Sequence, residues 1–551
     1  MTGGGEAASS AAGVVAKSGS VQARLVIATC VLWAVGAAQI VVPVVIARQP
    51  ASYECPLAGS DAPRGGGWRP CLVSEACSAS INGRPVQYDP RETLVSEFPG
   101  LVCASGAFLL GLAGTFFFLG FMVGAGLAGW GGDRFGRRPV MRTSYVGLAV
   151  GSLGTAFAGS FPVYAALRFG IGCSVAACLL SSYTITTEVV PGGRRALVSV
   201  AANAAFAVPG ELFPLLLAWM LTKDENRLSG AQGGDAGWRS VAAGCALLVI
   251  FVMGPIVLWM PESARWLVSQ GRAAEAKSEV ARLCNLGENE MDDADEVLGE
   301  LLRDSSEESA STATPVVRVD DEGDEEGSIL RPPTASASMD PPGEELHGVL
   351  HGVLHPKLRF AALANFCVWF VTSFVYYGIT LGVGSLGAGN LLLNSAVSAC
   401  VEVPAALAAN ATLGRPAMGR RLSGTLFLCI SGCACLLMAI PGADGYDVLR
   451  NLAVQCGKFG ATGTFVVVYV HAVEIFPTPV RALGVGMSSQ AARVGAMAAP
   501  LVGAVALALG MPNLQMTVFG AAALLCAFLY LRLPETLGRK LPEGLADLRS
   551  D

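Results

Sequence analysis

Charged residues are scarce in this chain, and their scarcity excludes an ordinary soluble protein. Of its 551 residues only 15% are charged, whereas 52% are hydrophobic and 67 are glycines. Soluble domains usually carry a charge on about a quarter of their residues. We therefore expect an all-α membrane protein whose main surroundings are a lipid bilayer.

The sequence also lacks the residue sets by which enzymes are identified. It contains no set of nucleophile, base and orienting acid, no metal cluster and no phosphate-binding loop. We therefore expect neither catalysis nor a cofactor, a metal or a nucleic-acid partner. The oligomeric state stays open at this point.

Long apolar runs recur along the whole chain. A helix needs about 20 residues to cross the hydrocarbon layer of a bilayer. Runs of this length lie at 24–46, 106–129, 140–160, 162–189, 196–221, 239–260, 359–383, 388–412, 422–440, 448–474, 481–507 and 511–533. They predict twelve transmembrane helices. The first run is too long for a removed signal peptide and lacks the context of a cleavage site.

Lysine and arginine are missing from the short connections near residues 160, 384, 443 and 510. The alternate connections carry arginines instead, at Arg134, Arg137, Arg138, Arg142, Arg194, Arg195, Arg415, Arg420, Arg421 and Arg481. Basic residues concentrate in cytoplasmic loops. We therefore expect these loops and both termini in the cytoplasm, and the protein in the plasma membrane.

Three short phrases occur twice at nearly constant offsets. Gly-Arg-Arg, Glu-x-x-Pro and Pro-Glu begin at Gly136, Glu188 and Pro261, and again at Gly419, Glu474 and Pro534. Such regularity indicates one six-helix unit used twice. Secondary transporters form their substrate site between two such halves.

These patterns divide the chain into five parts. We expect a disordered cytoplasmic N-terminus at 1–22, a first six-helix half at 23–260, an inter-half loop at 261–356, a second half at 357–533 and a cytoplasmic tail at 534–551. Within the inter-half loop, residues 288–345 hold nineteen acidic residues against three arginines, so we expect this segment to be disordered.

Two features of the inter-half loop leave alternatives open. Ser305, Ser306 and Ser309 are candidates for phosphorylation or partner docking, or they belong to an insertion that is merely tolerated. The histidines at 347, 351 and 355 share one helical face, which suits either a metal site or a helix that leads into the seventh span.

The connection between the first two spans, 48–103, forms an extracellular loop domain in this scheme. It contains four cysteines, Cys55, Cys71, Cys77 and Cys103. In an oxidising compartment they predict two disulfides, with three connectivities that remain open. The loop lacks an N-glycosylation sequon, and the sequon at Asn410 falls at the cytoplasmic end of span 8.

Longer phrases of the chain resemble a known family. They are Asp133-Arg-Phe-Gly-Arg-Arg138, Pro261-Glu-Ser-Ala-Arg-Trp-Leu267, Glu474-Ile-Phe-Pro-Thr-Pro-Val-Arg481 and the loop ending from Tyr88 to Cys103. Together they resemble the organic cation, organic anion and carnitine transporter family of the major facilitator superfamily. The resemblance covers residues 21–540 and implies a major facilitator fold. One departure is that the second half has no counterpart of Asp133.

The charged residues of the repeated phrases are candidates for a cytoplasmic gate. These candidates are Asp133, Arg134, Arg137, Arg138, Glu188, Arg194, Glu474 and Arg481. We expect ion pairs of Asp133 with nearby arginines, and of Glu188 or Glu474 with Arg194, Arg195 or Arg481, to join the halves on the inside when the cavity opens outward. Each exposed pair is worth about 0.2–1 kcal/mol. The alternative is that these arginines only set the topology.

Four ionisable residues fall near the middle of predicted spans, namely Glu211, Glu402, Lys458 and Arg493. A charge at that depth is costly unless it faces a watered cavity or a partner. We expect Glu402 and Arg493 to lie on opposite walls of one cavity and to bind the two ends of a substrate. The alternative is mutual pairing inside the bundle.

Aromatic residues add a second feature to the expected substrate site. Trp369 and Tyr376 lie two turns apart on one face of span 7, and Tyr377 follows. Aromatic faces attract ammonium groups, and the resemblance implies that Trp369 and Tyr376 line an organic cation pocket. By the same resemblance, Glu402 matches cation and carnitine carriers, whereas Arg493 matches anion and carnitine carriers.

We therefore expect an alternating-access transporter of small organic cations or carnitine-like zwitterions. One alternative is an organic anion exchanger. The other is a receptor or scaffold with a transporter fold and no flux.

Overall fold

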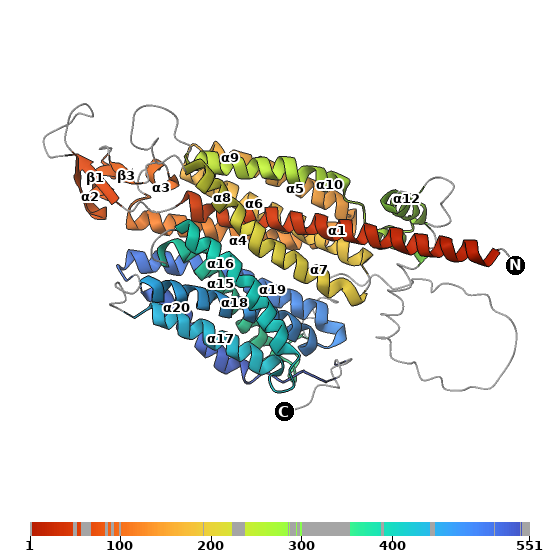
Figure 1. The fold of residues 1–551 in the computed structure, drawn as a ribbon. Helices are drawn as coiled ribbons and strands as arrows, with labels where there is room; N and C mark the ends of the chain where they lie inside the picture. The colour runs from red at the N-terminus through yellow and green to blue at the C-terminus, as the bar shows by residue number, and fades with distance from the viewer. Residues whose placement is uncertain are drawn as a thin grey trace.

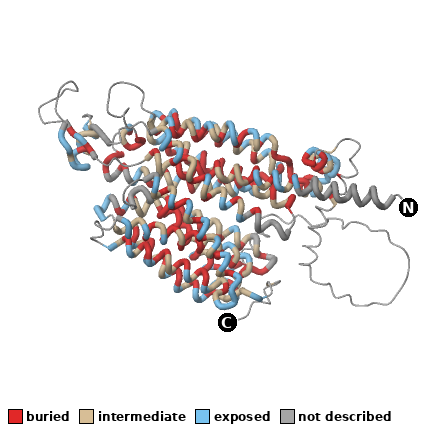
Figure 2. Tube along the Cα trace, in the orientation of Figure 1, coloured by how far each residue is buried: buried red, intermediate tan, exposed pale blue. Residues whose placement is uncertain are grey.

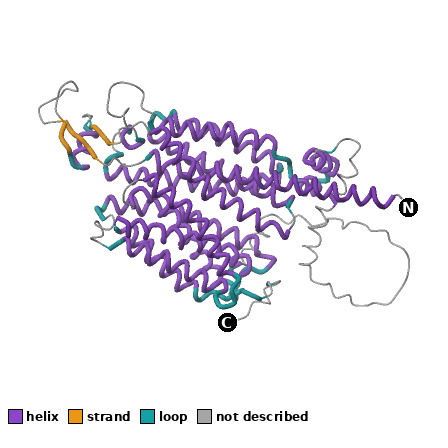
Figure 3. Tube along the Cα trace, in the orientation of Figure 1, coloured by secondary structure: helices purple, strands orange, loops and turns teal. Residues whose placement is uncertain are grey.

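A computed structural model describes residues 3–47, 52–56, 68–82, 86–89, 93–98, 101–190, 192–222, 237–284, 353–386, 391–440, 447–511 and 513–539, with a few isolated positions besides. Long helices dominate it, and the strands lie at one end of the molecule (Figure 3). We call this the sheet end. The opposite end, where the chain turns at Gly136 and Gly419, is the arginine end.

The first half contains six spans. They are α1 (Gly3–Ile46), α4 (Ala104–Phe135), α5 (Arg137–Ala156), α6 (Phe161–Val189), α7 to α8 (Gly192–Ala205, Glu211–Thr222) and α9 to α10 (Trp238–Leu248, Gly254–Trp259). The fifth and sixth spans each contain a π-helical turn, η1 (Phe206–Gly210) and η3 (Val249–Met253). Pro209 within η1 has no N–H to donate, so the regular α-helical ladder is interrupted there.

The second half contains the remaining six spans. They are α15 (Arg359–Leu386), α16 (Leu391–Leu413), α17 (Gly419–Met438), α18 (Asp447–Ile475), α19 (Thr478–Ala508) and α20 (Leu514–Tyr530). In Figure 1 the helices of the first half, red to green, lie beside those of the second half, teal to blue. Within the described residues, nine spans are long and apolar enough to cross a bilayer by themselves. The other three are α5, α19 and α20, and the twelve-helix prediction is confirmed.

The N-terminal helix begins earlier than expected. We predicted disorder for residues 1–22, but α1 already begins at Gly3. The segment from 6 to 17 is rich in alanine and contains no proline, which favours a helix.

Burial is concentrated on the facing sides of the long helices, as Figure 2 shows.

Two short helices follow the first half at the arginine end, α11 (Ala264–Ser269) and α12 (Ala273–Cys284). A guanidinium nitrogen of Arg138 contacts Oε1 of Glu279 on α12 at 2.9 Å. Arg24 of α1 donates to the carbonyl of Leu283 at 3.3 Å. The predictions for 288–345 and for the histidines at 347 and 351 fall almost entirely outside the described residues.

A small domain at the sheet end contains a three-stranded antiparallel sheet that the sequence did not lead us to expect. Its strands are β1 (Ser52–Pro56), β2 (Trp68–Pro70) and β3 (Gln87–Asp89), in the order β2-β1-β3. The helices α2 (Val73–Ile81) and α3 (Leu94–Glu97) accompany it.

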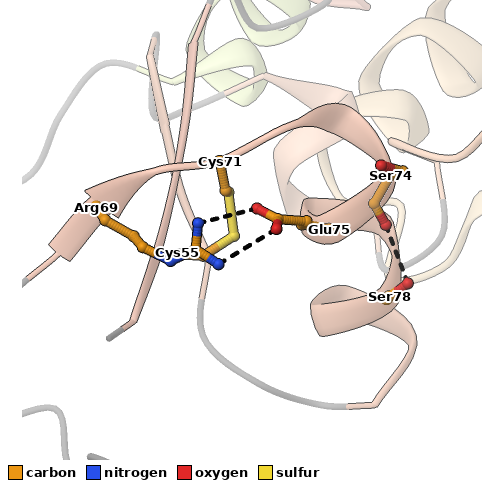
Figure 4. The surroundings of a disulfide bond; sticks show 6 residues. All are labelled: Cys55, Arg69, Cys71, Ser74, Glu75 and Ser78. Atoms are coloured by element: carbon orange, nitrogen blue, oxygen red, sulfur yellow. Dashed lines mark hydrogen bonds and ion pairs between the residues drawn. A yellow bond between two sulfur atoms is a disulfide. The ribbon is translucent and has the colours of Figure 1, made fainter. Parts of the chain in front are cut away.

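Two disulfides close this small domain. Of the three possible connectivities, the structure has Cys55–Cys71 and Cys77–Cys103. Cys103 directly precedes α4, so the second disulfide ties α2 to the start of a span. An ion pair between Arg69 and Glu75 at 3.2 Å lies beside the first disulfide (Figure 4).

The small domain is attached to the first half. Glu97 of α3 accepts a hydrogen bond from Nε1 of Trp238 at 2.6 Å and forms an ion pair with Arg239. Arg239 also donates to the carbonyl of Ala158 at 2.8 Å. The domain is therefore fixed to the α5–α6 connection and to the start of α9.

Candidate functional site

A glutamate completes the sharp turn at the arginine end of the first half. Gly136 has a φ of 99°, a conformation that residues with a Cβ rarely adopt. The Glu262 carboxylate accepts from the backbone N–H groups of Arg137 and Arg138 at 2.9 and 3.2 Å. It thus satisfies the free amides at the start of α5. Burial raises the pKa of the Glu262 carboxyl, although these N–H groups and that of Ser263 oppose the change.

The second half repeats this arrangement. Gly419 has a φ of 61°, and Glu535 accepts from the N–H groups of Arg420 and Arg421 at 2.9 and 3.0 Å. Burial alone would raise the pKa of the Glu535 carboxyl. The N–H groups of Leu537, Arg420 and Arg421 outweigh burial and hold that pKa below its usual range. The repeated Pro-Glu phrase therefore supplies a cap for the third span of each half, a role that we did not predict.

The gate candidates form ion pairs inside each half. Arg137 lies 3.2 Å from Asp133 and 3.4 Å from Glu188. In the second half, Arg420 contacts Glu474 at 2.8 Å, and Thr536 donates to Glu474 at 2.6 Å. In the second half, therefore, the arginine–glutamate pair is joined by Thr536, whereas in the first half it is joined by Asp133.

These pairings differ from the expected inter-half gate. Glu188 on α6 and Glu474 on α18 each pair with the arginine at the start of the preceding helix of their own half, Arg137 of α5 and Arg420 of α17. Arg481 instead donates to the carbonyl of Phe476 at 3.1 Å. Arg134 lies 5.7 Å from the ring centre of Trp130, and the side chain of Arg194 is outside the described residues.

Three of the four mid-depth ionisable residues meet at the boundary between the halves. Nζ of Lys458 on α18 lies 2.6 Å from Glu402 on α16 and 3.6 Å from Glu211, the first residue of α8. Lys458 also donates to Thr380 on α15. We call Glu211, Glu402 and Lys458 the charge triad. These three residues therefore pair with one another inside the bundle, which was the alternative to a role in substrate binding alone.

Tyr376 of α15 covers the charge triad. Its hydroxyl lies 2.7 Å from Glu402 and 3.5 Å from Glu211, and Nζ of Lys458 lies 3.8 Å from its ring centre. All four side chains are buried, and Lys458 has no exposed surface. Such burial of charge is tolerated only with partners of this kind.

Arg493 lies apart from the charge triad. Its guanidinium carbon is 4.2 Å from the ring centre of Phe121 on α4, and it acts electrostatically on the hydroxyls of Tyr377 and Tyr469. Among the described residues it forms no ion pair with a carboxylate, and its side chain is only partly buried. This arrangement leaves its charge available to an anionic group.

Aromatic rings occupy the space around these charges. Tyr377 contacts Phe118 of α4 at 4.6 Å between ring centres, and Trp369 contacts Tyr469 at 4.4 Å. Trp369 is fully buried, and its Nε1 has no hydrogen-bond partner in the described part of the chain. Of these residues, Phe118 and Phe121 were missed, because phenylalanines in an apolar span give no distinguishing signal.

The halves pack closely between mid-depth and the sheet end. Thr115 of α4 donates to the carbonyl of Met497 on α19 at 2.8 Å. A Cβ on Gly111 would lie 3.0 Å from the carbonyl oxygen of Pro500, so glycine is what allows the two helices to approach. The charge triad joins the two halves through other helices, α8 of the first half with α16 and α18 of the second.

Comparisons with known proteins agree with this architecture. Residues 104–454 match the model of the Major Facilitator Superfamily. The chain is 31% identical over 466 residues to solute carrier family 22 member 15 of Xenopus tropicalis, covering 83% of this chain and 75% of that protein. It is 29% identical to organic anion transporter 3 of Rattus norvegicus, covering 84% and 76%.

Solved structures agree at the level of the fold. The inward-open xylose transporter XylE from E. coli superposes with a TM-score of 0.61 and 15% identity, covering 96% of this chain and all of that one. At this identity the likeness concerns the fold alone.

Proposed function

Because this chain belongs to the major facilitator superfamily and, within it, to the solute carrier 22 family of organic ion transporters, we propose that its substrates are small organic cations or zwitterions. It is a multi-pass membrane transporter. We further propose that it works by alternating access in the plasma membrane, with the arginine end and both termini in the cytoplasm.

The charge distribution at mid-depth is the observation that carries this proposal. Two buried carboxylates, Glu211 and Glu402, face the single ammonium of Lys458. Arg493, across the aromatic rings, has no carboxylate partner among the described residues. A zwitterion would balance both charges, with its ammonium group beside the two carboxylates of the triad and its own carboxylate beside Arg493.

The aromatic rings favour the same class of substrate. The ring of Tyr376 already lies against an ammonium group, that of Lys458. An organic ammonium ion that lies against an aromatic ring gains about 0.5–2 kcal/mol.

Organic anion exchange is the second candidate. Two observations favour it, the available charge of Arg493 and the similarity of the chain to organic anion transporter 3 of Rattus norvegicus. On this alternative, Lys458 stays paired with Glu402 and only the Arg493 side binds substrate.

Ligand binding to the purified full-length protein distinguishes these candidates. The probes are tetraethylammonium, carnitine and benzoate, and the measurement is the shift of the melting temperature, since a bound ligand stabilises the folded protein. We expect the largest shift with carnitine and a smaller one with tetraethylammonium. A shift with benzoate alone would replace the proposal by anion exchange.

A further inference from the structure

The charge triad holds one negative charge more than its lysine can balance. Glu402 and Glu211 have oxygen atoms 2.6 and 3.6 Å from the same Nζ, so the two carboxylates are close neighbours. Both are at most 7% exposed. Two carboxylates that share a buried site do not both stay ionised without a further positive charge.

Hydrogen bonds do not supply this balance. The Tyr376 hydroxyl lies within 3.5 Å of both carboxylates, but it carries a single hydrogen and donates it to one of them at a time. The other phenol that acts electrostatically on both carboxylates is Tyr377, which likewise carries no positive charge. Lys458 divides its own donors between the carboxylates and Thr380.

Among the described residues, Lys458 is the only basic residue that forms an ion pair with Glu211 or Glu402. Residues 25–46 of α1 contain neither lysine nor arginine, and α16 contributes only Glu402. Arg239 of α9 is held at the sheet end by Glu97. Arg168 of α6 donates to the carbonyl of Gln39 at 2.9 Å, and Arg493 lies over Phe121.

We propose that the charge triad is a proton site shared with the substrate: one proton resides on the Glu211–Glu402 pair when the site is empty, and an entering ammonium group displaces it. This inference rests on the proposed function for its second half. The displaced proton leaves the carboxyl oxygen for water, and the substrate keeps all of its own hydrogens. Organic cation and proton then bind alternately at one place.

The charge triad spans the boundary between the two halves, so the ion that it binds affects how strongly the halves attract each other. Glu211 belongs to the first half, whereas Lys458, Glu402 and Tyr376 belong to the second. A proton on Glu211 weakens its attraction to Lys458 across the boundary, whereas an ammonium group strengthens the contact between the halves. Cation and proton are therefore expected to cross the membrane in opposite directions.

Proton release on binding tests the competition directly. Tetraethylammonium is added to the purified full-length protein in weakly buffered solution with a pH indicator, and this probe has no dissociable proton, so any proton comes from the protein. We expect close to one proton per bound cation near neutral pH. Glu211→Gln leaves one carboxylate for one lysine, so release should fall below about a tenth of the wild-type value. Glu275→Gln, at an exposed position, is the matched control.

An infrared measurement tests the proton site without substrate. We expect the stretching band of a protonated carboxyl group in the empty wild-type protein, lost in both Glu211→Gln and Glu402→Gln and lost when tetraethylammonium saturates the site. Its absence from about pH 5 to about pH 8 overturns the inference.

The outcomes separate this inference from the proposed function. Cation binding without proton release overturns the shared site and leaves the proposed function standing. If neither tetraethylammonium nor carnitine binds, the proposed function fails. In that case the infrared band still tests whether the carboxylate pair holds a proton. A band that is lost in Glu211→Gln and Glu402→Gln supports the proton site, and the absence of a band from the wild-type protein overturns it.

Discussion

At the scale of single residues, the chemistry is carried by a few charges in an apolar bundle. The sequence was sufficient to identify Glu211, Glu402, Lys458 and Arg493, because a charge in a long apolar run is conspicuous. It did not predict which of them pair. Pairing depends on how each helix is rotated about its axis, and the π-helical turn η1 directly before Glu211 changes that rotation in a way no periodicity reports.

Glu402 is the residue whose neutralisation should affect cations most. We expect Glu402→Gln to raise the KM for tetraethylammonium at least about tenfold, since a close charge pair at an effective dielectric of 20 is worth up to about 4 kcal/mol. Uptake into proteoliposomes measures the change. Glu275→Gln, exposed at the arginine end, should leave KM unaltered. An unchanged KM in the Glu402 variant would remove this residue from the substrate site.

Arg493 should act on the other end of the substrate. We expect Arg493→Asp to reduce carnitine uptake to less than about a tenth, while tetraethylammonium uptake is kept or increased because a further carboxylate now faces the site. Arg539→Asp, at an exposed position, is the control for the charge change. Equal loss of both substrates at normal protein yield would mean that Arg493 serves the structure rather than selectivity.

At the scale of elements, each half is built around one capped turn. The sequence contained the Gly-Arg-Arg and Pro-Glu repeats but gave no reason to connect them, because more than a hundred residues separate Gly419 from Glu535. The structure shows the connection, in which the carboxylate binds the amides that follow the glycine. The small sheet was also unexpected, since its strands of three to five residues are too short for a clear alternation.

The glycine at this turn should tolerate no side chain. A Cβ on Gly419 would overlap the Glu535 carboxylate, and its φ of 61° is unfavourable for residues other than glycine by about 1–2 kcal/mol. We therefore expect Gly419→Ala to lower the melting temperature of the purified protein. Gly486 lies in helix α19 with open space around it, so Gly486→Ala should leave stability unchanged or raise it. Equal melting temperatures for the two variants would contradict the role of the turn.

The two capping glutamates should respond to pH in opposite directions. The pKa of Glu535 is lowered in the folded protein, because the backbone N–H groups of Leu537, Arg420 and Arg421, and then His471, outweigh the effect of burial. Its contribution is therefore present above about pH 4.3 and is lost as the pH falls through that lower pKa. The pKa of Glu262 is raised, so its contribution is present below about pH 4.3 and is lost as the pH rises through the raised value.

Melting curves of Glu535→Gln and Glu262→Gln across this range measure both effects. Relative to the wild type, the loss of stability in Glu535→Gln should shrink in acid. In Glu262→Gln it should shrink instead as the pH rises. Parallel profiles for the two variants would show that the caps are electrostatically equivalent.

At the scale of the whole molecule, the two halves meet between mid-depth and the sheet end. Apolar runs and repeated phrases were sufficient to predict twelve spans in two halves. They did not predict that the gate candidates would pair within each half, since a charge motif does not specify its partner. The contacts that do join the halves, such as Thr115 with Met497 and Lys458 with Glu211, are single residues without a motif.

The central claim is that this molecule moves a substrate with a positive end held at the charge triad. Uptake of labelled carnitine and tetraethylammonium into proteoliposomes containing the full-length protein tests it most directly. We predict saturable accumulation of both, with carnitine uptake abolished in Arg493→Asp and tetraethylammonium uptake weakened in Glu402→Gln. Accumulation of benzoate alone, or binding of carnitine and tetraethylammonium without any accumulation, would contradict the account.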